Sequence, residues 1–129
     1  MNDLKFLELP DGKKYPMCLS INVMAELQKK YGSFEETMEL IDSSKQNEIN
    51  YAVLIDFYYY SINEGIDIYN ENKNEQEKMN FVSERQAGRI ISELGFAKSK
   101  ETAKSTVIST DTSTSTKSAD DGETVLKNV

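Results

Sequence analysis

The sequence predicts a mainly α-helical domain with a small N-terminal β-hairpin, an α+β arrangement in which about four helices pack on the hairpin. Three observations predict this class. Two short strand-like segments near the N-terminus are joined by a Pro-Asp-Gly turn. Several later segments carry apolar residues at helical spacing, with capping residues at their ends. All 12 aromatic residues (7 Tyr and 5 Phe) precede residue 97, which places the folded domain in residues 1–96.

The hairpin is predicted from residues 4–9 and 15–19. Pro10 suits the second position of a tight turn, and Gly12 supplies the positive φ that such a turn needs. Pro16 has no amide donor, so the second strand is expected at a sheet edge. Because an isolated hairpin is only marginally stable, a helix is expected to cover one of its faces.

Two helices are predicted after the hairpin. The first begins near residue 20 and ends at residue 31, where Gly32 follows it. The second begins after Ser33, which has the capping-box spacing to Glu36. The apolar stripe of the first helix is expected to comprise Ile21, Met24, Ala25, Gln28 and Tyr31, widened by Val23 and Leu27. A polar link, residues 42–47, comes next.

The most apolar segment is predicted to be a helix from Glu48 to Glu64 that ends at Gly65. Its apolar residues cover nearly its whole circumference, so it is expected to be buried on several sides or to touch a partner. A β-strand is the alternative, because Tyr and Phe favour strands. The length of the segment favours the helix.

The rest of the chain is more polar. Residues 66–78 are expected to be a loop or a poorly packed helix. Ser83 and Gln86 again have capping-box spacing, and they open a last helix that runs to Leu94. Residues 97–129 contain 13 Ser or Thr and no aromatic residue. Such a segment buries too little apolar surface to offset its chain entropy, so it is predicted to be a disordered tail.

Composition excludes several functional classes. The chain has no His and a single Cys, which removes His-dependent catalysis, His-ligated metals and a multi-thiolate zinc site. Its net charge of −7 opposes nucleic-acid binding. No apolar run is long enough to span a bilayer, and the N-terminus does not resemble a signal peptide. We therefore expect a cytoplasmic protein that is not an enzyme, with no cofactor, no metal, no nucleic acid and no membrane partner.

Few residues suggest a binding site. Residues from Asp67 onward are rich in side-chain oxygens, as a calcium-binding loop would be. Asn72 stands at the position where an EF-hand loop needs Gly, so an EF-hand calcium site is not expected. Arg85 and Arg89 stand at i and i+4, where they could grip an anion, face solvent or pair with acids elsewhere.

The run of three tyrosines at 58–60 is the feature of most interest. Three successive residues spread over about 200° of a helix, so at least one is expected to face outward. Tyrosine is enriched at interface hot spots. The alternative to an interface is that these tyrosines belong to a small core, with their hydroxyl groups reaching solvent. The predicted partner-binding residues are Leu54, Tyr58, Tyr59 and Ile62.

A family resemblance extends this interpretation. The segment Leu7 to Met17 (LELPDGKKYPM) resembles the opening hairpin of the tail assembly chaperones of long-tailed bacteriophages. The segment Ser20 to Glu36 (SINVMAELQKKYGSFEE) resembles that family's first helix, its Tyr-Gly stop and the start of its next helix. The apolar helix that ends Ile62-Asn63-Glu64-Gly65 and the last helix from Ser83 continue the same order, over residues 4–95 in all.

The resemblance implies a non-enzymatic role in the cytoplasm of a bacterial host. Such chaperones coat and solubilise the long helical tape measure protein and help to recruit tail tube subunits, and they are absent from the finished virion. The expected partners are the tape measure protein and the tail tube protein, and self-association is left open. Whether the tail is a short-form end or part of a frameshifted extension is also open.

Three other functions are alternatives. A head–tail joining protein or another structural morphogenesis protein would remain in the virion. A small host regulator would bind a protein or peptide outside the tail genes. An enzyme that relied on carboxylates alone would need a cleft with paired acids of raised pKa.

Overall fold

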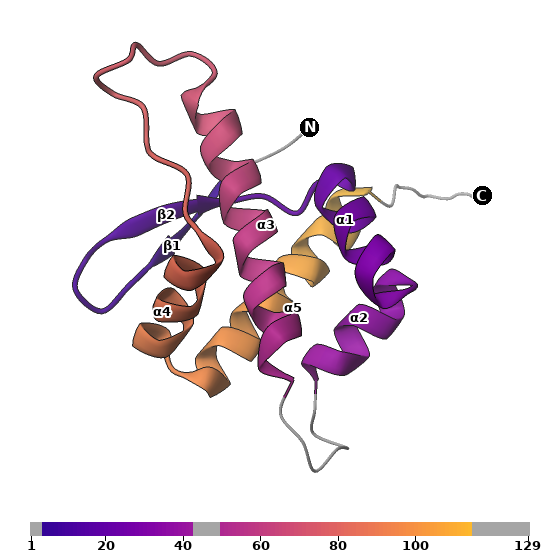
Figure 1. Cartoon of the computed structure of the whole chain (residues 1–129). Helices are drawn as coiled ribbons and strands as arrows, with labels where there is room; N and C mark the ends of the chain where they lie inside the picture. The colour runs from indigo at the N-terminus through magenta and orange to yellow at the C-terminus, as the bar shows by residue number, and fades with distance from the viewer. Residues whose placement is uncertain (1–3, 43–49, 115–129) are drawn as a thin grey trace.

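The computed structural model describes residues 4–42 and 50–114, with side chains as far as Thr106. In this part of the chain a two-stranded hairpin is followed by five helices (Figure 1). The elements are β1 (Lys5–Glu8), β2 (Lys14–Met17), α1 (Ile21–Tyr31), α2 (Phe34–Ile41), α3 (Tyr51–Asn70), α4 (Glu84–Leu94) and α5 (Phe96–Thr114). The predicted class, mainly α with an N-terminal hairpin, is confirmed, with five described helices in place of about four.

The hairpin forms as predicted. Strands β1 and β2 pair antiparallel, with Phe6 opposite Pro16. Gly12 has a φ of +92°, and its amide donates to the carbonyl oxygen of Leu9 at 2.9 Å. Leu7 and Leu9 are buried and Phe6 is half exposed. The sheet has only these two strands in the described chain, so each is an edge strand. Pro16, which has no amide hydrogen to donate, therefore interrupts no hydrogen bonding to a third strand.

The ends of α1 and α2 follow the predicted caps. The hydroxyl of Ser20 accepts from the amide of Val23, and Ser33 and Glu36 form a complete capping box. The predicted apolar stripe of α1 is confirmed only in part, and Met24 and Tyr31 pack partly buried against the core. Val23 and Leu27 are buried, whereas Ile21 is 81% exposed and Ala25 and Gln28 also face solvent. The spacing allowed two overlapping stripes, and only the position of α3 decided which of them is buried.

Helix α3 does not end at Gly65 but runs from Tyr51 to Asn70. A Cβ atom at Gly65 would lie 2.5 Å from the carbonyl carbon and oxygen of Pro16. Gly65 therefore allows strand β2 to cross α3 at close range, and it does not stop the helix. The carbonyl oxygen of nearby Ser61 accepts a hydrogen bond from the amide of Cys18 at 3.0 Å, which joins the strand end to the helix.

Helix α4 begins at its Ser83–Gln86 capping box and ends before Gly95, as predicted. The predicted disordered tail is wrong at its start, because α5 occupies Phe96–Thr114. Ser99 and Ala103 in α5 are 0% exposed. Their small side chains let α5 pack against its neighbours, and among the described side chains of α5 only Phe96 is large and apolar, so composition alone did not reveal the packing. Residues 115–129 of the predicted tail, and the link at 43–47, lie outside the described residues.

Helix α3 is the centre of the fold. It contacts β2 and each of the other four helices of the described chain. Figure 1 shows it running between α4 on one side and α1 and α2 on the other. This position explains why α3 is apolar nearly all round, since almost every face meets a neighbour.

Candidate functional site

The predicted partner-binding residues do not form one surface. Leu54 is 1% exposed, and Tyr58 and Ile62 are 0% exposed, so all three belong to the core. Only Tyr59 lies partly at the surface. The prediction is corrected accordingly: the aromatic helix presents some of its tyrosines outward, but its strongest apolar stripe holds the domain together.

Tyr58 joins α3 to α5. Its hydroxyl donates to the backbone carbonyl of Ser99 at 2.8 Å within the core. Burial raises the pKa of Tyr58 to about 12, because the phenolate would be poorly solvated there. The residue is therefore a structural tyrosine whose polar end is satisfied by the backbone of the last described helix.

Tyr59 and Tyr60 point instead into an open groove between α1, α3 and the loop before α4. Its volume is about 600 Å³. We call it the acidic groove and define it by Glu26, Lys29, Tyr59, Tyr60, Glu64, Asp67 and Phe81. The two tyrosine rings contact edge to face, with centroids 5.2 Å apart. The groove thus offers adjacent aromatic surfaces with polar tips, a composition suited to protein contact.

Carboxylates outnumber cations in the acidic groove. Glu64 and Asp67 make no ion pair with any residue that the structure describes. Lys29 lies 3.6 Å from Glu26, so its charge is offset within the groove. The remaining charge is negative and favours a partner with basic side chains.

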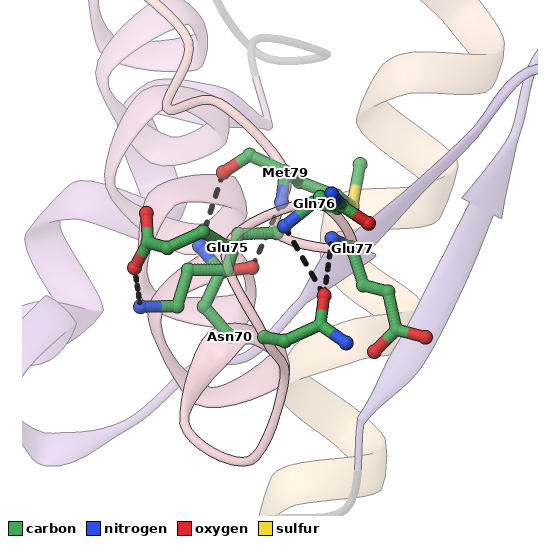
Figure 2. A network of polar contacts seen from close by, with 7 residues as sticks. Asn70, Glu75, Gln76, Glu77 and Met79 are labelled. Carbon is green, nitrogen blue, oxygen red and sulfur yellow. Dashed lines mark hydrogen bonds and ion pairs between the residues drawn. The ribbon is translucent and has the colours of Figure 1, made fainter.

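Phe81 completes the groove because two asparagines of α3 hold the loop that carries it. Asn63 donates to the carbonyl of Val82 at 3.0 Å and accepts from its amide at 2.8 Å. Asn70 makes the same pair of bonds with Met79, at 3.0 and 2.9 Å (Figure 2). These four bonds fix the returning chain along α3, and Phe81 between them stays 57% exposed.

A polar cluster fixes α1 against α3 beside the acidic groove. Asp56, 7% exposed, accepts from Lys30 at 3.1 Å and from the hydroxyl of Tyr31. The hydrogen bond to Asp56 raises the pKa of Lys30 to about 12. Burial, followed by the bond to Asp56, raises the pKa of Tyr31 to about 12. The ammonium of Lys30 also lies 5.7 Å from the centroid of Tyr60, so the cluster positions one wall of the groove.

A second groove lies between α3, α4 and the start of α5, with a volume of about 450 Å³. We call it the arginine groove and define it by Tyr51, Leu54, Ile55, Arg85, Gly88, Arg89, Ile91 and Phe96. Tyr51 is 57% exposed, and its ring packs edge to face on Phe96 with centroids 5.3 Å apart. The floor is apolar, and α4 supplies the charge.

The two arginines of the chain both line this second groove. Arg85 and Arg89 are exposed, and neither makes an ion pair with any described residue. Of the alternatives left open by their i, i+4 spacing, pairing with acids elsewhere is therefore not observed in residues 4–42 and 50–114. Both guanidinium groups are available to an anionic partner.

Other features offer less to a partner. A groove between the hairpin and α5 is lined by charges of both signs, from Lys5, Glu8, Lys98 and Glu101. Cys18 is buried, and burial raises the pKa of its thiol, with a smaller contribution from Glu64. Among the described residues, no group of three or more His, Cys, Asp or Glu side chains is placed to hold a metal ion.

No protein-family model, curated protein or solved structure matches the chain. Within the described part, none of the helices combines the length and apolarity needed to cross a bilayer.

Sequence reasoning found only parts of both grooves. It singled out Tyr59 and the arginine pair, but it missed Phe81. The one available signal was the seven-residue spacing of Asn63 and Asn70, which places both amides on one face of a helix. That signal has meaning only once α3 is known to continue past Gly65.

Proposed function

We propose that this chain is a tail assembly chaperone of a long-tailed bacteriophage or prophage. In this role it binds and solubilises the tape measure protein in the host cytoplasm and helps to recruit tail tube subunits. The resemblance over residues 4–95 supplies the proposed partners. The acidic groove is the observation that carries the binding role.

The groove suits the apolar stripe of a helix. Tyr59 and Tyr60 of α3 and Phe81 of the loop alongside it offer aromatic surface from two segments of the chain. Helix-in-groove recognition uses such surfaces to cover residues at i, i+3, i+4 and i+7. Glu64 and Asp67 favour a helix that carries lysine or arginine beside its apolar stripe. A long helical protein with repeated stripes of this kind would provide many such sites.

The charge of the chain supports a solubilising role. A net charge of −7 keeps a protein coat dispersed through mutual repulsion. Each bound copy would cover apolar surface on the partner and replace it with a negatively charged surface. This effect needs no catalytic step.

Affinity purification of the tagged full chain during phage production tests the proposal, with bound proteins identified by mass spectrometry. We expect a very long helical protein together with the tail tube subunit. Recovery of portal or connector proteins alone would favour a head–tail joining role. Recovery of a host protein alone would contradict a role in tail assembly.

A double substitution tests the groove itself. Tyr59→Ala with Phe81→Ala should weaken tape measure binding at least about tenfold, because buried aromatic residues dominate interface energetics. Phe6→Ala is the matched control, since Phe6 is an exposed aromatic residue, 50% accessible, on β1. Equal binding by both variants and the unchanged chain would remove the acidic groove from the proposal.

A further inference from the structure

The arginine groove combines an apolar floor with two arginines that no described residue pairs, on a strongly acidic chain. Ile55 and Ile91 contribute to the floor, and Tyr51 and Phe96 form its aromatic edge. Arg85 and Arg89 stand one helical turn apart on α4 and both line this opening, and Arg89 also lines a smaller pocket on the side of Tyr15. In a chain of net charge −7, two cations without partners among the described residues mark a local reversal of charge.

Gly88 keeps this groove open. Glycine within a helix costs about 1 kcal/mol relative to alanine, so its presence in the middle of α4 needs a reason. The fold of the described chain does not supply one. A Cβ atom at Gly88 would meet the Cδ1 atom of Ile55 at 3.7 Å, which is ordinary van der Waals contact. Gly65 differs, because there the backbone of β2 excludes any side chain.

The chemistry of the groove defines what fits it. A guanidinium group binds a carboxylate through two parallel hydrogen bonds, and such charge-assisted bonds are strong. The floor between the aromatic edge and α4 requires apolar side chains. We propose that the arginine groove binds a segment of a partner protein in which carboxylate side chains flank an apolar stripe, as on an acidic amphipathic helix.

This inference goes beyond the proposed function and does not depend on it. The two grooves differ in the sign of their charge, so a segment that fits the acidic groove is disfavoured in the arginine groove. The arginine groove is therefore assigned to a different segment from the one bound beside Tyr59, and both can be occupied on one molecule. Failure of either groove in a binding assay leaves the other testable.

Two synthetic helical peptides test the inference on the full chain. They share one leucine stripe and differ only in having glutamate or lysine beside it. Fluorescence anisotropy at low salt should show binding of the glutamate peptide that weakens as salt is added, whereas binding of the lysine peptide, which suits the acidic groove, should depend on Tyr59 and Phe81. No binding of the glutamate peptide, or binding that Tyr59→Ala with Phe81→Ala removes, overturns the proposal.

Substitutions locate the site. Arg85→Glu with Arg89→Glu should weaken binding of the glutamate peptide at least about tenfold. Gly88→Leu should abolish binding of the glutamate peptide by filling the groove, and circular dichroism with a thermal melt checks that the variant is folded. Tyr59→Ala with Phe81→Ala is the control that should leave this binding unchanged. If the Tyr59→Ala, Phe81→Ala variant loses the glutamate peptide and Gly88→Leu still binds it, the peptide does not bind in the arginine groove.

Two further outcomes identify a different occupant. Sedimentation equilibrium that shows a dimer in the unchanged chain and a monomer in Gly88→Leu would assign the groove to a second copy and overturn the proposal. Tighter binding of a single-stranded oligonucleotide than of the glutamate peptide would likewise overturn it, in favour of phosphate recognition by the arginines.

Discussion

The two grooves take aromatic residues from the same helix but differ in charge. Tyr59 and Tyr60, near the middle of α3, lie with Glu64 and Asp67 in the acidic groove. Tyr51, at the start of α3, meets Arg85 and Arg89 in the arginine groove. One apolar helix thus supplies the core and contributes to two surfaces of opposite charge. The comparison shows that α3 itself supplies Glu64 and Asp67 to the acidic groove, whereas α4 supplies the two arginines of the arginine groove.

The largest expected effect comes from disrupting the close contact between α3 and β2, the helix and strand that meet at Gly65. Gly65→Ala should lower the free energy of unfolding by about 3 kcal/mol, because its new methyl group would overlap the rigid backbone at Pro16. Denaturant unfolding measures the change. Gly88→Ala, the same substitution in α4, should raise stability by about 0.5–1 kcal/mol. Equal effects at the two glycines would contradict the different roles assigned to them.

A second substitution should separate the two grooves. Asn63→Ala removes both hydrogen bonds to Val82 and leaves a buried amide and carbonyl without their partners. We expect a loss of about 2 kcal/mol in unfolding free energy. Binding at the acidic groove should fall, since Phe81 is released, while peptide binding at the arginine groove should persist.

The matched control for Asn63 is Asn74→Ala. Asn74 also accepts backbone hydrogen bonds, from Gln76 and Glu77, but in the exposed part of the loop. Its removal should change stability by less than about 0.5 kcal/mol. A comparable loss at both positions would mean that the loop contributes to stability through its whole length and not through the bonds to α3.

A smaller effect on stability is expected for Tyr58, the buried tyrosine that joins α3 to α5. Tyr58→Phe keeps the ring in the core and removes the hydrogen bond to Ser99, at a cost of about 1 kcal/mol. Tyr59→Phe should leave stability unchanged. Thermal unfolding of the two variants compares them directly, and an equal loss in both would indicate that Tyr59 is as constrained as Tyr58.

The smallest effect on stability near neutral pH is expected from the titration of Lys30, Tyr31 and Tyr58. Tyr31 and Tyr58 have pKa values raised from 10.0 to about 12, and Lys30 from 10.5 to about 12. In each case the folded state holds its proton more tightly, so this stabilisation is complete below about pH 10. It is lost as the pH rises to about 12. Denaturant unfolding should show little change from these groups between pH 7 and 9 and a steep decline above pH 10.

Substitutions test which groups cause the decline in stability above pH 10. In Tyr58→Phe with Tyr31→Phe, the decline should be shallower, because two of the three titrating groups are gone. An unchanged slope would show that other groups dominate the alkaline transition.

The sequence by itself determined the features that depend on neighbours along the chain. The turn at Gly12 and the capping boxes at Ser33 and Ser83 were all predicted, together with the helices that they begin. A cap or a turn needs partners only three or four residues away, so the residues that define it stand together in the sequence. For the same reason, the spacing of Arg85 and Arg89 was visible before the groove was known.

Only the tertiary structure decided features that depend on which element approaches from elsewhere. Gly65 looked like a helix stop but accommodates β2, and Tyr58 looked like a binding residue but closes the core against α5. Ser99 and Ala103 belong to a segment whose composition predicted disorder, yet their small size is what allows a close helix contact. Phe81 entered the site through hydrogen bonds made by α3. In each case the energy comes from a contact between residues distant in sequence, which no local pattern encodes.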